Sequence, residues 1–209
     1  MGKIFYIAGK SSSGEDTIYR RLLDCTDLRL ETLVPYTTRP IRDGEENGRE
    51  YFFTDEAELE RLRAEGKIIE ERMYSTFYGP WYYFTVDDGQ LDLEKQDYLL
   101  IGTLESYRAV KRFVGKEKIV PIYIEVEDGE RLQRALDREK KQENPKYEEM
   151  CRRFLADEED FSPSHLEQSN ITRQYENVVL EDCLREIVQE IGRVCHTQSN
   201  AGQPEVQDI

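Results

Sequence analysis

The chain has 209 residues, of which 38% are hydrophobic and 35% charged, and its formal net charge at pH 7 is -15. This length suits one domain whose core is large enough to fold without disulfides or metal. The acidic balance argues against nucleic-acid binding, which needs a basic face, and no apolar run approaches the ~18 residues needed to cross a bilayer.

The apolar run 4–8 is too short for a secretory signal peptide and ends in a turn. The four cysteines, at positions 25, 151, 183 and 195, show no CxxC spacing, and the chain has only two histidines, so a zinc site is not expected. Reduced thiols and a cytoplasmic location are therefore predicted.

The predicted elements alternate between strands and helices along the chain. A buried strand over 3–8 leads through a glycine-bounded loop into a helix over 17–23, which is the opening of a βαβ unit. We expect an extended segment at 28–38, a loop at 41–49, strands at 50–54, 98–102, 119–126 and 178–180, and helices at 55–65, 105–113, 128–141, 146–161 and 183–194. This alternation predicts a parallel sheet wrapped by helices.

Two further segments stand apart from that alternation. The segment 67–85 holds seven aromatic residues and predicts a small β lobe with a turn at Gly79 and Pro80. The segment 86–93 predicts a short helix or loop. Residues 196–209 lack apolar periodicity, which predicts a disordered tail.

The loop after the first strand has the backbone features of a phosphate-binding P-loop. Gly9 and Gly14 have the separation found in Gly-x-x-x-x-Gly-Lys-Ser/Thr, but Glu15 stands at the lysine position and Asp16 at the hydroxyl position. Glycines let successive N–H groups turn inward, and the following helix adds its positive end. By itself the pattern also fits an ordinary β–α turn. The candidate donor-phosphate residues are Gly9, Ser11, Ser12, Ser13, Gly14, Glu15, Asp16 and Thr17.

A more specific pattern occupies 37–51, which reads TTRPIRDGEENGREY. The planar guanidinium groups of Arg39 and Arg42 suit the oxygens of a phosphate, and Tyr51 adds a phenol. The segment resembles the monophosphate-binding loop of guanylate kinases, TTR-x-x-R-x-GE-x-x-G-x-x-Y, at every fixed position. The resemblance implies that Arg39, Arg42, Glu45 and Tyr51 bind GMP, whereas the alternative is a solvated polar turn.

The same resemblance continues in register over roughly 3–192. Ile68-Ile69-Glu70 is similar to the segment whose carboxylate reads guanine, with Glu71 as the alternative after a slip of one residue. Tyr78 resembles the tyrosine that closes over the phosphate, and Pro80 replaces a hydroxyl residue there. Thr103 stands where the family has acidic residues, and it would contact a guanine edge more weakly.

Three arginines resemble those of the family's lid, which reaches over the triphosphate. Arg134 and Arg138 precede the polar break at 142–145, and Arg153 follows it. The resemblance implies that Arg134 binds ATP phosphate, and that Arg138 and Arg153, together with Arg42, are catalytic. The alternative for the three lid arginines is a charged helix face.

The resemblance implies a P-loop NTPase-type α/β fold in one domain over 1–195. Its parallel sheet core, flanked by helices, is expected at about 1–33, 96–130 and 162–195, a mixed-β monophosphate-binding lobe at about 34–88, and a helical lid at about 134–160. The implied reaction transfers a phosphoryl group from ATP to GMP, or dGMP, with Mg²⁺ held by Asp16 and Thr17. Neither nucleic acid nor a membrane is an expected partner, and the sequence leaves the oligomeric state open.

Glu15 is the main departure from the family. Two unit charges ~4 Å apart interact by about 4 kcal/mol at an effective dielectric near 20, so replacing a lysine by a carboxylate is a large local penalty. Catalysis is therefore expected to be weakened or lost, unless a metal bridges Glu15 to the phosphates or Lys10 swings in. Because Glu15 departs from the motif, an inactive GMP-binding or protein-binding module of guanylate kinase type is the alternative. Whether Glu15 is natural or introduced stays open.

Overall fold

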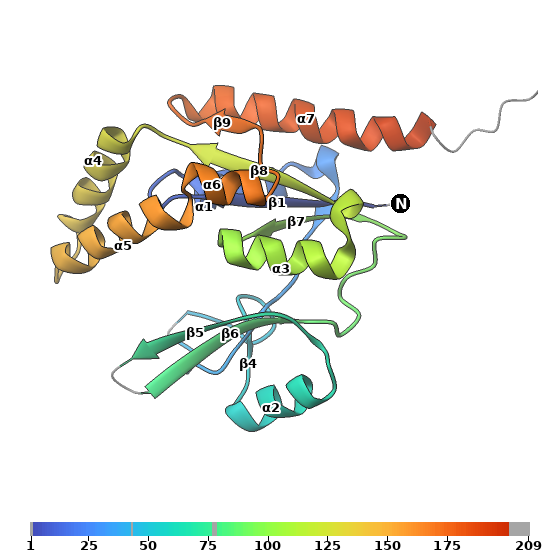
Figure 1. The fold of residues 1–209 in the computed structure, drawn as a ribbon, viewed down its shortest axis with the longest axis horizontal. Coiled ribbons are helices and arrows are strands. Elements are labelled where there is room, and N and C mark those ends of the chain that lie inside the picture. The colour runs from blue at the N-terminus through green and yellow to red at the C-terminus, as the bar shows by residue number, and fades with distance from the viewer. Residues whose placement is uncertain (1, 43, 77–78, 201–209) are drawn as a thin grey trace, which may run out of the picture.

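A five-stranded parallel sheet forms the centre of the molecule, in the order β2-β7-β1-β8-β9 (Figure 1). The structure is a computed structural model that describes residues 2–42, 44–76 and 79–200. The strands are β1 (Ile4–Gly9), β2 (Leu30–Glu31), β7 (Asp97–Ile101), β8 (Ile119–Glu125) and β9 (Gln174–Glu176). The predicted parallel sheet is confirmed, but its last strand lies at 174–176 instead of 178–180.

The two faces of this sheet are covered by different helices. Because side chains alternate along a strand, Ile4 and Tyr6 of β1 point to one face and Phe5 and Ile7 to the other. The first face packs against α3 (Leu104–Val114) and α6 (Pro163–Gln168), and the second against α1 (Glu15–Leu23) and α7 (Leu180–Asn200). Figure 1 shows α7 and α3 on opposite sides of the sheet. The core is therefore two apolar layers separated by one sheet.

The ends of two predicted segments differ from the structure. Helix α7 continues to Asn200, so the predicted disorder is wrong for 196–200, and 201–209 lie outside the described residues. Helix α6 was not predicted. Short 3-10 turns, η1 (Thr26–Leu28) and η2 (Lys116–Lys118), complete the core. In the described part of the chain, no helix has both the length and the apolar character needed to cross a membrane.

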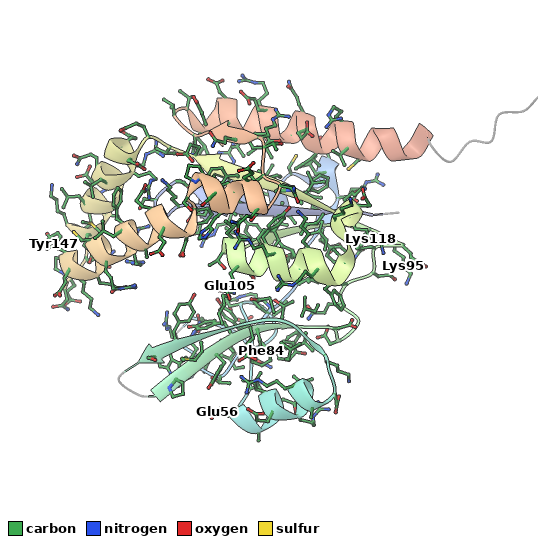
Figure 2. The ribbon with its side chains drawn as sticks, viewed as in Figure 1. Glu56, Phe84, Lys95, Glu105, Lys118 and Tyr147 are labelled. Carbon is green, nitrogen blue, oxygen red and sulfur yellow. The ribbon has the colours of Figure 1, made fainter. Side chains whose placement is uncertain are left out.

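A second, mixed sheet forms the lobe, in the order β4-β3-β6-β5. Its elements are β3 (Tyr36–Thr37), β4 (Phe52–Phe53), β5 (Ile68–Thr76), β6 (Gly79–Val86) and helix α2 (Glu56–Ala64). Asp55 caps α2 by accepting a hydrogen bond from the Glu58 N–H at 2.9 Å, as its sequence position predicts. Leu59 and Leu62 of this helix pack on Phe84, which Figure 2 marks inside the lobe. Gly79 and Pro80 belong to β6, so the turn predicted there is wrong.

Two helices project from the edge of the core and are called here the lid helices, α4 (Asp128–Glu139) and α5 (Tyr147–Asp160) (Figure 1). Tyr147 marks the outer end of α5 in Figure 2. Arg131, which is 1% exposed, joins the two helices. Its guanidinium lies 2.6 Å from Glu158 and stacks on Phe154 at 4.4 Å from the ring centre. A buried charge thus fixes the angle between the lid helices.

Leucine-to-alanine substitutions test the packing of the layer that α1 forms with the sheet. Leu22 is 1% exposed on α1, whereas Leu155 on α5 is 69% exposed. We expect Leu22→Ala to lower the free energy of unfolding by about 2–5 kcal/mol, because it removes buried methyl groups and leaves a cavity. Leu155→Ala should stay within about 0.5 kcal/mol. Urea unfolding measures both, and equal effects would contradict the assigned packing.

Candidate functional site

Two cavities meet at the loop that joins β1 to α1. The larger, about 640 Å³, lies between the carboxyl ends of β1 and β7 and the lobe. The smaller, about 390 Å³, lies between the start of α1, helix α4 and the segment that follows β9. Glu15 and Asp16 line both cavities. The large cavity is called the cleft below and the small one the side cavity.

The backbone of the loop adopts an inward-curled shape that requires its two glycines. Gly14 has a φ of 93°, and a Cβ at Gly9 would collide with Ser13 and with the carbonyl of Ile124. The carbonyl of Ser13 accepts from Asn177 Nδ2 at 2.7 Å, and that of Ser11 accepts from Arg131 at 3.1 Å. Ser13 donates its own N–H to the Lys10 carbonyl at 3.0 Å, so among the described residues the N–H groups of Ser12 and Gly14 remain available to a ligand.

Glu15 folds back over this loop instead of pointing into solvent. Its Oε2 atom accepts a hydrogen bond from Ser13 Oγ at 2.7 Å. Burial raises the pKa of Glu15 above its usual range, and the nearby charges of Asp16 and Asp157 add to that effect. The position that would carry the P-loop lysine therefore presents a desolvated carboxyl to both cavities.

Lys10 does not compensate for Glu15 in this conformation. Its Nζ atom lies 2.8 Å and 3.0 Å from the two carboxylate oxygens of Glu158 and 3.4 Å from Asp128. The next residue, Ser11, donates its N–H to Asp157 Oδ2 at 2.8 Å. Both contacts tie the start of the loop to the lid helices, so the positive charge of Lys10 is committed to lid carboxylates.

The loop 37–51 is organised around one ion pair. Both terminal nitrogens of Arg39 bond to the Glu45 carboxylate, at 2.7 Å and 2.6 Å. The same guanidinium lies over the rings of Tyr51 and Phe53, 5.1 Å and 5.3 Å from their centres. The hydrogen bonds from Arg39 and from the Arg42 N–H lower the pKa of Glu45 to about 2. The ion pair between Arg39 and Glu45 is thus formed without a ligand.

Only some of the predicted GMP-binding residues line the cleft. Tyr51, Glu70 and Thr103 do so, whereas Arg39, Arg42 and Glu45 do not in this conformation. That these last three bind GMP stays a prediction, and Tyr78 lies outside the described residues. The arginines that line the cleft are Arg20, Arg49 and Arg72, which sequence analysis did not select.

Signals for two of these arginines were present in the sequence. Arg49 occupies a variable position of the loop motif, directly before the part that ends in Tyr51. Arg72 follows Glu70 by two residues, which is the spacing that places side chains on one face of a strand.

The inner end of the cleft holds a buried carboxylate. Glu70 is 6% exposed, and it accepts from Thr85 Oγ1 at 2.9 Å and from Arg72 Nε at 3.2 Å. Glu71 instead pairs with Arg63 of α2, away from the cleft. Of the two alternatives left open by the sequence, the structure brings Glu70 to the cleft. Thr103 caps α3 there by accepting from the Ser106 N–H at 3.2 Å.

The three lid arginines are placed differently from one another. Arg134 and Arg138 line the side cavity. Arg134 is held by Glu130 at 3.0 Å and donates to the Asn177 carbonyl at 3.0 Å. Arg153 lines neither cavity and lies 3.7 Å from Glu149 on its own helix. In this conformation Arg153 therefore belongs to a charged helix face.

The predicted metal ligands, Asp16 and Thr17, are exposed at the first turn of α1 and line the side cavity. Among the residues whose side chains the structure describes, no group of three or more His, Cys, Asp or Glu side chains is arranged to hold a metal ion. Mg²⁺ at nucleotide sites commonly uses one or two protein oxygens together with phosphates and water. The oxygen donors of Asp16 and Thr17 fit that pattern.

The family model and the curated relatives that the sequence matches carry the same description. A family model described as Guanylate kinase matches residues 1–198. The guanylate kinase of Nitrosomonas europaea is 38% identical over 80 residues, which are 38% of this chain and 39% of that protein. That of Mycoplasma pneumoniae is 39% identical over 79 residues, 37% of this chain and 33% of that protein. The chain therefore matches about two-fifths or less of the length of these relatives.

A solved structure supports the fold. The crystal structure of guanylate kinase from Anaplasma phagocytophilum superposes with a TM-score of 0.62, covering 92% of this chain and 85% of that chain. The identity over this match is 21%, so it bears on the fold alone.

The buried carboxyl of Glu15 predicts an unusual dependence of stability on pH. Because its pKa is raised in the folded state, folding binds a proton there, and stability rises as the pH falls through that raised pKa. Glu15→Gln should therefore stabilise the protein at pH 7, with a gain that shrinks as the pH falls toward the ordinary carboxyl range. Urea unfolding at several pH values measures this. Asp27→Asn, at an exposed position of η1, is the control, and a gain for Glu15→Gln that is independent of pH would contradict the assignment.

Proposed function

The chain belongs to the guanylate kinase family, and on that premise we propose that it binds GMP in the cleft and ATP with Mg²⁺ at the side cavity. The proposed reaction is ATP + GMP to ADP + GDP, weakened or lost because Glu15 replaces the P-loop lysine. The observation that carries the proposal is the meeting of two cavities at one inward-curled loop. Two nucleotides bound there would meet end to end through their phosphates.

In this proposal the lobe holds the acceptor. Glu70 and Thr103 read the base, and Tyr51 contacts the phosphate together with Arg42 and Arg39. Arg39 would exchange part of its ion pair with Glu45 for a phosphate oxygen, which conserves its charge pairing. Arg49 lines the cleft and adds a further cation. Tyr78 keeps its predicted role of closing over the same phosphate.

The donor would be held mainly by backbone. The N–H groups of Ser12 and Gly14 would face the phosphates, and the N-terminus of α1 adds its partial positive charge. Arg134 lies at the side cavity, and closure of the lid would bring Arg138 and Arg153 over the phosphates and exclude water. Asp16 and Thr17 would hold Mg²⁺, which neutralises phosphate charge when it is bound.

Glu15 opposes the donor half of this arrangement. A carboxylate at the lysine position repels phosphate oxygens, and neither Lys10 nor Arg131 is free to offset it, since both are paired with lid carboxylates. The second candidate function, a catalytically inactive GMP-binding or protein-binding module, rests on this one residue. The two candidates differ in whether the side cavity accepts Mg-ATP.

Calorimetry separates these candidates. If the chain is a phosphotransferase, both GMP and Mg-ATP should bind when titrated separately. GMP binding alone, or no binding of either ligand, would favour the inactive module.

A coupled kinase assay tests the role of Glu15 directly. We expect Glu15→Lys to raise the rate of GMP phosphorylation about a hundredfold or more over the chain as it stands, because it turns repulsion of several kcal/mol into attraction. The control is Asp24→Lys, which makes the same charge reversal at an exposed position at the far end of α1. No gain for Glu15→Lys would mean that the P-loop interpretation of Glu15 is wrong or that other losses dominate.

Removing Arg39 tests the acceptor site. Arg39→Ala should lower GMP affinity about tenfold or more, since a hydrogen bond to a charged group is worth about 1.5–3 kcal/mol. Arg61→Ala, on the exposed surface of α2, is the control. Titration calorimetry with GMP gives both affinities, and an unchanged value for Arg39→Ala would remove this residue from the site.

A further inference from the structure

A pair of opposite charges lies at the inner end of the cleft, where a base would sit. Glu70 and Arg72 are two residues apart on β5, so both face the cleft, while Glu71 between them faces α2. Arg72 Nε lies 3.2 Å from Glu70 Oε2, and the two side chains are 23% and 4% exposed. Neither charge is fully solvated, which makes each of them sensitive to what fills the cleft.

The pair has hydrogen-bonding capacity left over. A guanidinium carries five N–H donors, and among the described residues Arg72 uses them only on Glu70. Each carboxylate oxygen of Glu70 has one protein partner, Thr85 on Oε1 and Arg72 on Oε2, so each keeps acceptor capacity. The inner wall therefore offers two acceptors beside a charged donor.

This order of groups complements the edge of only one common nucleobase. Guanine presents a 2-amino donor, an N1–H donor and a 6-oxo acceptor in sequence. Hypoxanthine lacks the 2-amino donor, and adenine has an amino group in place of the 6-oxo and no N1–H. Either of them would leave part of a partly desolvated charge pair unmatched, which is costly.

We propose that Arg72 is a specificity-determining residue, whose terminal N–H groups donate to the 6-oxo group of guanine while Glu70 accepts from N1–H and the 2-amino group. This inference rests on the proposed function, because it deepens the base recognition of the same cleft. Of the arginines that line the cleft, Arg72 is the one that contacts Glu70 within the described residues. Pro35, which also lines the cleft, brings no donor of its own.

The test measures the affinities of Arg72→Met and of the unmodified chain for three monophosphates. The probes are GMP, IMP and purine ribonucleoside 5′-monophosphate, which lacks both the 6-oxo and the 2-amino group. Arg63→Met is the matched control, because Arg63 pairs with Glu71 on the opposite face of the same strand. Thermal unfolding of each variant establishes that it is folded.

Arg72→Met should lower the affinity for GMP and for IMP about tenfold or more and leave that for the purine ribonucleotide within about twofold. The control should change none of the three. Loss of GMP and IMP binding together with an equal loss for the purine ribonucleotide would show a merely structural role and overturn the inference. Unchanged affinity for GMP would overturn it too.

If Arg72→Met does not fold, the double variant Glu70→Gln/Arg72→Met removes both charges and is compared with Glu70→Gln alone. The inference then requires a further loss of IMP affinity in the double variant, and no further loss would overturn it. If the unmodified chain does not bind GMP, the proposed function is wrong, and this inference is wrong with it.

Discussion

Hydrogen bonds from side chains outside the loop between β1 and α1 hold its backbone in place, and this loop lines both cavities. Asn177, which follows β9, and Arg131 of α4 each donate to a carbonyl of this loop, and the Ser13 N–H closes a turn on the Lys10 carbonyl. A glycine at position 14 permits the left-handed turn that this shape needs. The cleft, the side cavity and the lid helices are all arranged around this short piece of backbone.

The charges around that loop are distributed unusually. Lys10 lies in the loop and Arg131 donates to it, and both cations are bound by Asp128 and Glu158 of the lid helices. The carboxyl of Glu15 therefore faces the cavities with the Ser13 hydroxyl, and no cation among the described residues, as its side-chain partner. In the proposed function, affinity for the donor phosphates would therefore come from backbone dipoles and from Arg134 and Arg138, which line the side cavity.

Sequence reasoning predicted the parallel sheet, the lobe and the capped start of α2, because each depends on local periodicity or on a capping residue. It selected Glu70 and kept Glu71 as the alternative, since a slip of one residue changes the face of a strand, and β5 has an irregularity between Ile68 and Glu70. It misplaced the last strand because only Tyr175 of β9 is buried. It also could not show that the guanidinium of Arg39 pairs with the Glu45 carboxylate, because that ion pair depends on the folded path of the loop.

Arg131 links the lid helices to the loop between β1 and α1. One guanidinium, buried against Phe154, bridges the Ser11 carbonyl and the carboxylate of Glu158. A swing of α5 cannot leave the loop undisturbed, because separating a buried ion from its partner is far more costly than tilting the two segments together. The position of α5 and the shape of the loop between β1 and α1 are thus coupled through one buried ion.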